Sequence, residues 1–161
     1  MFLDRTTAVV AAAAALLLCT APAVAAESPF SSLAGAWGGS GHVTFTGGQR
    51  EALKCKAYYN PKEGGSGLSL AMRCASASAK LEFRANLEYA GGSVSGSWEE
   101  RTYNASGKVT GKASNSHLNL HINGGGLTAS MSVQMSGASQ AVSISTNGAG
   151  FSGVSINLSK G

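Results

Sequence analysis

The chain contains few of the residues that most often carry out chemistry. It has a single aspartate, Asp4, and three histidines, and charged residues make up 12% of its 161 positions. Because Asp4 lies in an N-terminal leader, the mature chain has no aspartate and cannot form a Ser-His-Asp triad. Only a glutamate could complete such an arrangement. The composition therefore predicts a protein that is not an enzyme.

The sequence also lacks patterns typical of metal and nucleic-acid sites. His117 and His121 are four residues apart on one face of a predicted strand, which separates them by about 13 Å, too far to share one ion. We therefore predict no metal site and no cofactor. Loss of Asp4 and Arg5 with the leader leaves 11 basic and 7 acidic residues and a net charge of +4. The basic residues are scattered singly among glutamates, which argues against nucleic acid as a partner.

No apolar run is long enough to span a membrane. The longest, Ala8–Cys19, has 12 residues, which suits the core of a signal peptide, whereas a membrane span needs about 20. Pro22 and the small residues at 23–26 follow it, as at a signal-peptidase site. Two alternatives are a retained anchor and lipidation of Cys19, although Leu18 is larger than the residue that usually precedes a lipidated cysteine.

These features predict three parts: a signal peptide at 1–26, a short N-terminal arm at 27–33 and a single domain at 34–161. The 135 residues left after cleavage are enough for one domain and too few for two. The predicted location is the periplasm or outside the cell, with no membrane span in the mature chain.

Two cysteines, Cys55 and Cys74, remain after removal of the leader, and an even pair in an exported chain favours a disulfide. Alternation places both on the apolar faces of two strands that flank the turn-rich segment 60–67. If these strands form a hairpin, the two cysteines can lie opposite each other. The alternative is a pair of buried free thiols.

Apolar and polar residues alternate along most of the mature chain, the period at which side chains change faces in a strand. Glycine-rich turns divide this pattern into short pieces, and no segment after the leader has helical periodicity. The pattern predicts an all-β antiparallel meander of about 8–10 strands that closes into a small barrel or a barrel-like sandwich. The predicted strands are residues 36–46, 50–59, 68–76, 79–89, 93–103, 107–115, 117–122, 127–136, 139–146 and 150–159.

Large apolar side chains on the inward faces are candidates to line a ligand site. Many other inward positions are alanine or glycine, so the interior is either a cavity or a tightly closed core. Glu100 follows the indole of Trp98 at a strand end, where its carboxylate is a candidate acid of raised pKa, a ligand anchor or an ordinary ion-pair partner. Its replacement by glutamine is expected to leave stability nearly unchanged. The candidate lining residues are Trp37, Met72, Phe83, Trp98, Glu100, Met131 and Met135.

Short motifs resemble known families. Gly35-Ala36-Trp37 and Gly96-Ser97-Trp98 resemble the G-x-W motif of lipocalin-like barrels, in which the tryptophan closes one end. The order of several motifs along the mature chain resembles small exported alphaproteobacterial proteins whose role is not established, which implies a setting in the bacterial envelope. Small periplasmic metalloprotease inhibitors share the L-x-G-x-W start and the single disulfide, but this chain differs from them in its Gly/Ser-rich second half. The motifs in question are Leu33–Trp37, Cys55–Tyr58, Arg73–Ser76, Gly96–Glu100 and Gln140–Ile144.

Together, the pattern and the resemblance predict a lipocalin-like barrel that acts as a non-enzymatic binding module. Its predicted ligand is a small apolar or amphipathic molecule. The alternatives are a protein-contact module of the protease-inhibitor type and a structural envelope protein, so the partner is either a small ligand or an envelope protein. An exposed N-terminal arm would favour the inhibitor type.

Overall fold

The structure is a computed structural model that describes residues 21–22 and 27–161. The signal peptide predicted at 1–26 lies outside the described residues, apart from 21–22, and so does Cys19. In the part of the chain that the structure describes, no helix has the length and apolar character needed to cross a membrane.

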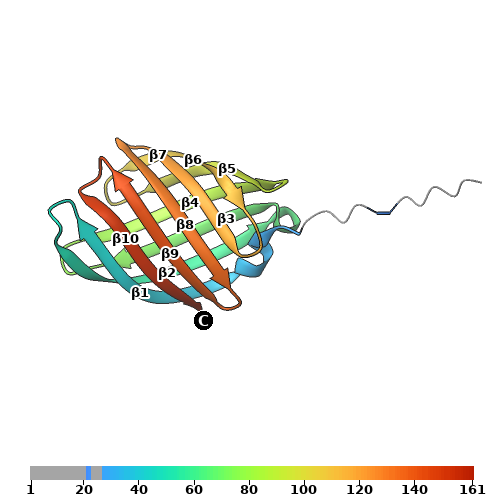
Figure 1. Cartoon of the computed structure of the whole chain (residues 1–161), viewed down its shortest axis with the longest axis horizontal. Coiled ribbons are helices and arrows are strands. Elements are labelled where there is room, and N and C mark those ends of the chain that lie inside the picture. The colour runs from blue at the N-terminus through green and yellow to red at the C-terminus, as the bar shows by residue number, and fades with distance from the viewer. Residues whose placement is uncertain (1–20, 23–26) are drawn as a thin grey trace, which may run out of the picture.

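Ten antiparallel strands follow one another and close into a barrel (Figure 1). Each strand pairs with the next along the chain, and the last also pairs with the first. The all-β meander predicted from the alternation is therefore confirmed. The strands are β1 (Gly35–Phe45), β2 (Arg50–Lys62), β3 (Gly67–Ala75), β4 (Lys80–Ala90), β5 (Ser93–Glu100), β6 (Ala105–Ala113), β7 (His117–Gly124), β8 (Leu127–Ser136), β9 (Ser139–Asn147) and β10 (Phe151–Lys160).

The largest differences from the predicted strands are at the end of β2, which was expected to stop at residue 59 and reaches Lys62, and at the end of β5, which was expected to reach residue 103 and ends at Glu100. Residues 101–104 form a turn instead, and Asn104 has a positive φ of 53°. Asparagine tolerates this left-handed conformation better than most residues do. The turn brings Arg101 and Tyr103 to the surface at one end of the barrel.

The two ends of the barrel differ. One end, called the closed end below, holds the turns at 91–92, 114–116 and 137–138 together with two short 3-10 helices, η1 (Pro29–Leu33) and η2 (Glu63–Gly65). The other, called the open end, holds the turns at 46–49, 76–79, 101–104, 125–126 and 148–150. In Figure 1 the open end is on the left and the closed end on the right.

Helix η1 packs onto the closed end. Ser28 begins it by accepting a hydrogen bond from the Phe30 N–H at 3.2 Å. Phe30 has no exposed surface and Leu33 is 3% exposed, so residues 29–33 are part of the packed structure. Gly65 of η2 lies against this helix with φ +96°, and the Ser31 hydroxyl oxygen occupies the position that a Cβ would take. Only glycine suits both the backbone conformation and the close contact.

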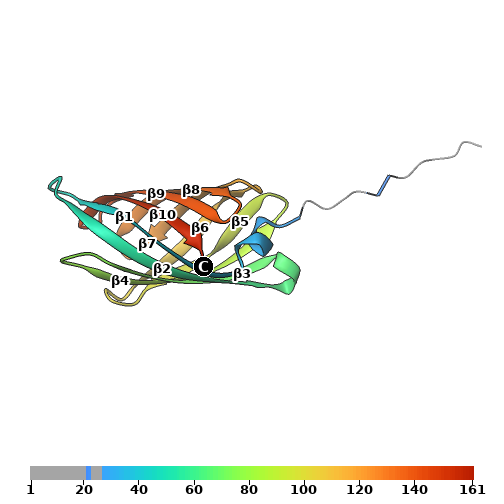
Figure 2. The same ribbon diagram turned by 90° about the horizontal axis from the view of Figure 1, so that it is seen from below.

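The barrel is flattened, with β8 and β9 in one wall and β2, β3 and β4 in the other (Figure 2). Glycines lie on the inward side where the sheet bends between these walls. At Gly39 and Gly41 of β1, carbonyl oxygens of β10 occupy the positions of a Cβ, and carbonyl oxygens of β7 do the same at Gly107 and Gly111 of β6. Glycine in a strand permits this close approach of a second backbone, and so permits a sharp bend.

A disulfide joins Cys55 of β2 to Cys74 of β3, as the sequence predicted. The two residues are direct partners in the antiparallel register. Since both side chains belong to the buried core, the bond lies inside the barrel and not on its surface.

Removal of this bond by Cys55→Ser with Cys74→Ser is expected to lower the free energy of unfolding by about 3 kcal/mol, because the bond closes a loop of about 20 residues in the unfolded chain. Urea denaturation of the oxidised protein and the double variant measures the difference. Two thiols that react with an alkylating agent in the native, unreduced protein would contradict the pairing.

Candidate functional site

Many inward-facing apolar side chains near the open end keep exposed surface. Phe45, Leu81, Leu127 and Phe151, at or next to the ends of their strands there, are only partly buried. The same holds for Leu70, Phe83, Met131 and Ile144, which lie farther along their strands. These side chains therefore keep apolar surface near the open end that the barrel itself does not cover.

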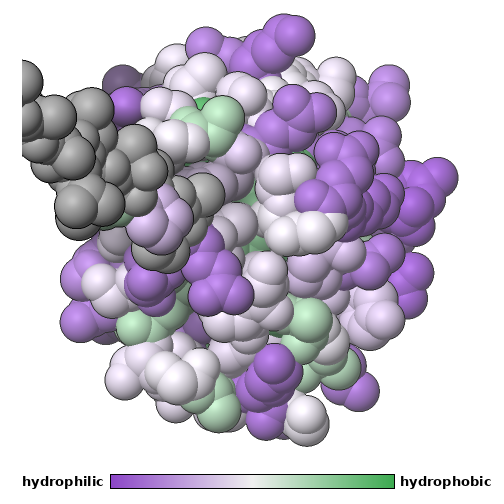
Figure 3. Space-filling view, turned by 90° about the vertical axis from the view of Figure 1, so that its right-hand side faces the viewer, coloured by the Kyte–Doolittle hydropathy of each residue, from purple (hydrophilic) through white to green (hydrophobic). Residues whose placement is uncertain are grey.

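The closed end, in contrast, is sealed. Trp37 is 3% exposed, and its indole Nε1 donates a hydrogen bond to the Leu33 carbonyl oxygen at 2.8 Å. Tyr59 packs edge-on against Trp37, with ring centres 6.1 Å apart. In the space-filling view onto this end, hydrophilic residues and residues of near-neutral hydropathy make up most of the coloured surface, and hydrophobic residues show only in small patches (Figure 3).

A buried polar pair lies behind this seal. The Tyr59 hydroxyl donates to Oε1 of Gln140 at 3.0 Å, and Gln140 is 3% exposed. Burial raises the pKa of Tyr59 to about 12, although the hydrogen bond with Gln140 acts in the opposite direction. The phenol therefore stays protonated at neutral pH. Nε2 of Gln140 has no hydrogen-bond partner among the described residues.

Four of the predicted lining residues come together in one wall, toward the open end. Phe83 of β4 is the direct partner of Met72 on β3 and of Glu100 on β5. The ring of Phe83 stacks on the indole of Trp98, with centres 5.8 Å apart and planes 15° apart. Trp98 is 4% exposed and donates from Nε1 to the Asn123 carbonyl oxygen at 3.1 Å. This group forms an aromatic wall that is buried at Trp98 and partly exposed at Phe83.

The other three predicted lining residues lie elsewhere. Met131 is on β8, outside this wall, and is partly exposed toward the interior. Trp37 and Met135 are buried at the closed end, so they do not belong to the accessible region. The strand pattern could identify inward positions, but it could not indicate which end of the barrel is sealed.

Glu100 is a structural carboxylate in this fold. Its Oε1 accepts hydrogen bonds from the backbone N–H of Glu82 at 2.7 Å and of Thr102 at 3.1 Å, and its Oε2 accepts from that of Tyr103 at 2.7 Å. Burial raises the pKa of Glu100, but these backbone donors outweigh it, so the pKa is lowered overall. The interpretation of Glu100 as an acid of raised pKa is therefore wrong. The side chain holds the turn at 101–104 onto β4.

The structure changes the expected effect of Glu100→Gln. An amide nitrogen cannot accept the Tyr103 N–H, so the variant is expected to lose about 1.5–3 kcal/mol of unfolding free energy at pH 7. Because the folded pKa is lowered, the stabilisation is present above the ordinary value of 4.5 and is lost as the pH falls through the folded value. The difference between the variant and the parent should therefore shrink below about pH 4.5. Urea titrations at several pH values measure it.

The matched control for this prediction is Glu99→Gln. Glu99 is exposed and adjacent in sequence, and its replacement should change stability by less than about 0.5 kcal/mol. Equal stability of Glu100→Gln and the parent at pH 7 would contradict the role of Glu100 in the turn.

Two accessible aromatic residues, Phe45 and Phe151, were absent from the predicted set. They are partners at the open end of the β1–β10 pair, where the register shifts between Thr44 and Phe45. Each lies beside a turn, where alternation no longer indicates the face. Leu81, Leu127 and Ile144 were not among the predicted lining residues either, and all three are partly buried and packed against the core.

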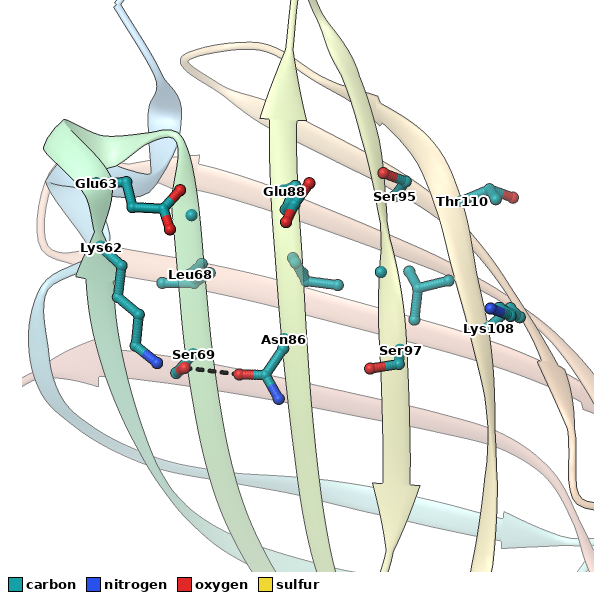
Figure 4. A pocket seen from close by; sticks show the side chains of 14 residues that line it. Lys62, Glu63, Leu68, Ser69, Asn86, Glu88, Ser95, Ser97, Lys108 and Thr110 are labelled. Atoms are coloured by element: carbon teal, nitrogen blue, oxygen red, sulfur yellow. Dashed lines mark hydrogen bonds between the residues drawn. The ribbon is translucent and has the colours of Figure 1, made fainter.

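A polar hollow of about 590 Å³ lies on the outside of the barrel (Figure 4). The Ser69 hydroxyl donates to Oδ1 of Asn86 across it at 2.7 Å, and Glu63, Glu88 and Lys108 border it. Most of its side chains are hydrophilic and exposed or half-buried, whereas Leu68, Leu87 and Val109, which also line it, are buried. A second hollow, of about 430 Å³, lies beside Leu127 at the open end.

The described residues include no group of three or more histidine, cysteine, aspartate or glutamate side chains that could hold a metal ion. His117 contacts the Ser116 hydroxyl through its Nδ1 at 2.9 Å. The partly exposed inward side chains near the open end are apolar or aromatic.

Comparisons with known proteins indicate the fold. No protein-family model matches the sequence, and neither does any curated protein. Among solved structures, Rv2717c from M. tuberculosis is similar with a TM-score of 0.67 and 12% identity, over 81% of this chain and 94% of that chain. The S-type phycobiliprotein lyase CPES from Guillardia theta is similar with a TM-score of 0.58 and 9% identity, over 80% of this chain and 86% of that one. Both are lipocalin-like barrels, so the resemblance to this fold is confirmed.

The same comparison corrects one prediction. The scarcity of catalytic residue types predicted a protein that is not an enzyme, but one structure with this barrel is that of a lyase. The inference was wrong because a missing Ser-His-Asp triad excludes one mechanism and not the reactions that a barrel can promote on a bound molecule.

Proposed function

We propose that the barrel binds a small apolar or amphipathic molecule, which enters through the open end, and that the protein works in the periplasm or outside the cell. The observation that carries this proposal is the gradient of exposure inside the barrel. Most inward apolar side chains are buried at the end that η1 and Trp37 cover, where Tyr89 and Ala113 are partly buried, and a larger set is partly exposed at the other end. Exposed apolar surface of this kind is costly unless a ligand covers it.

The positions of the charged side chains limit which kind of ligand can bind inside the barrel. Every lysine and arginine among residues 27–161 is exposed, and the carboxylate of Glu100 is occupied by backbone donors. A buried charge without a partner is strongly unfavourable, so the part of the ligand inside the barrel should be uncharged. A polar head group would remain at the open end.

The alternative of an inhibitor-like contact module gains no support from the N-terminal segment. That function was expected to use an exposed arm, but Phe30 and Leu33 are buried against the barrel. No other feature of the described residues favours it over ligand binding.

The proposal can be tested with the fluorescent probe N-phenyl-1-naphthylamine. We expect saturable binding at one site, with displacement by oleate. The variant Met131→Glu, which puts a charge inside the accessible interior, should weaken binding at least about tenfold, or about 1.4 kcal/mol. Fluorescence titration measures both effects.

The control is Ser130→Glu, which adds the same charge at the exposed neighbouring position on β8. It should leave the affinity for the probe unchanged. Absence of saturable binding in a folded, disulfide-bonded sample would contradict the proposal, as would an equal loss of affinity in the two variants.

A further inference from the structure

The basic residues of the domain are unevenly distributed. Seven of them lie on the outer side of β2, β3 and β4 or in the turn at 101–104, all within the half of the barrel nearer the open end. Lys54, Ala75 and Lys80 form one row across three strands, and Lys56, Arg73 and Glu82 form the next. We call this set the basic strip. Its members are Arg50, Lys54, Lys56, Arg73, Lys80, Arg84 and Arg101.

Most of the net charge comes from the basic strip. On β2 to β5 and the turn at 101–104, the acidic residues in this half are Glu51, Glu82, Glu99 and the buried Glu100, so seven positive charges against four leave +3 there, of the +4 carried by residues 27–161. The opposite wall is different, because the sequence from Ala113 to Ser159 contains no Asp, Glu, Lys or Arg. The open end therefore has one basic side and one uncharged side.

Internal ion pairs do not neutralise the strip. Three guanidinium groups converge on the single carboxylate of Glu82, with N–O distances of 3.3 Å from Arg84, 3.5 Å from Arg73 and 3.9 Å from Arg101. Partial burial raises the pKa of Glu82, but the arginines outweigh this and lower it overall, so the group stays ionised. Among the described residues, Lys54 and Lys80 make no ion pair or side-chain hydrogen bond within the usual limits.

The strip adjoins the apolar rim of the open end. Lys80 precedes Leu81 in sequence, and Arg50 lies across the 46–49 turn from Phe45, both rim residues being partly buried. An anionic lipid surface attracts clustered basic side chains, and its interface also accepts apolar side chains. Neither a purely polar partner nor a neutral bilayer would satisfy both features.

We propose that the basic strip and the apolar rim dock the open end of the barrel onto an anionic phospholipid bilayer. In this orientation the interior faces the membrane, so an apolar ligand can pass between them without crossing water. The inference rests on the proposed function for the direction of transfer. The docking itself can be measured without any ligand.

The test uses co-sedimentation of the folded protein with vesicles of phosphatidylglycerol and phosphatidylcholine, or of phosphatidylcholine alone. We expect binding to the anionic vesicles only, and weaker binding as salt rises, because ions screen charges beyond about 8 Å at physiological strength. Lys54→Glu with Lys80→Glu should weaken binding at least about tenfold. The control, Lys108→Glu with Lys112→Glu on β6, changes the net charge equally and should weaken binding less than about threefold.

A second variant tests the rim. Phe45→Ser should weaken vesicle binding at least about threefold, with its fold checked by circular dichroism and disulfide content. Equal losses in the two charge variants would overturn the proposal, since net charge alone would then explain binding. Full competition by soluble polyglutamate together with unchanged binding of Phe45→Ser would indicate a general polyanion site and would also overturn it. Probe binding without vesicle binding would overturn the docking and leave the proposed function standing.

Discussion

Replacement of Trp98 by alanine is expected to lower the free energy of unfolding by about 3–5 kcal/mol. The indole is 4% exposed, stacks on Phe83 and donates its N–H to the Asn123 carbonyl oxygen. The variant loses the buried aromatic surface, leaves a cavity in the wall and removes the indole donor from the Asn123 carbonyl oxygen, a part-buried hydrogen bond. All three losses lower the free energy of unfolding, because all three result from removing the same side chain. Urea or thermal denaturation measures the change.

The control for Trp98→Ala is Tyr103→Ala. Tyr103 is 64% exposed, and it contributes to the turn mainly through its backbone N–H, which alanine retains. Its replacement should change stability by less than about 0.5 kcal/mol. If Trp98→Ala had the same denaturation midpoint as the parent, the inward orientation of Trp98 would be wrong, and with it the register of β5.

The second large effect is expected at the closed end. Phe30→Ala should lower the free energy of unfolding by about 3–5 kcal/mol, because Phe30 has no exposed surface and packs edge-on against Tyr89 with ring centres 6.0 Å apart. The change should also loosen η1 over Trp37. Acrylamide quenching of Trp37, measured in a Trp98→Phe background, should then increase.

The control on the same segment is Ser31→Ala, at an exposed position. It should leave stability within about 0.5 kcal/mol of the parent and quenching unchanged. Stability of Phe30→Ala equal to that of Ser31→Ala would mean that the N-terminal segment does not seal the barrel.

The candidate site was predictable in part. Met72, Phe83 and Trp98 could be assigned to the interior because each occupies an inward position of a regular strand, and the structure groups them in one wall. The partners of Glu100 could not be predicted, because two of its three donors come from a turn that the sequence had suggested was strand. Phe45 and Phe151 were missed because each lies beside a turn, where the register shifts and alternation no longer indicates the face.

Alternation along the sequence determined which side chains face inward, since successive residues of a strand point to opposite faces of the sheet. The hairpin of Cys55 and Cys74 followed from the same local rule, because their strands are joined by a short segment. What only the tertiary structure decided depends on contacts made after the sheet closes. These are the sealing of one end by Phe30 and the bends at Gly39 and Gly107. Each joins residues on separate elements, so no local pattern could reveal it.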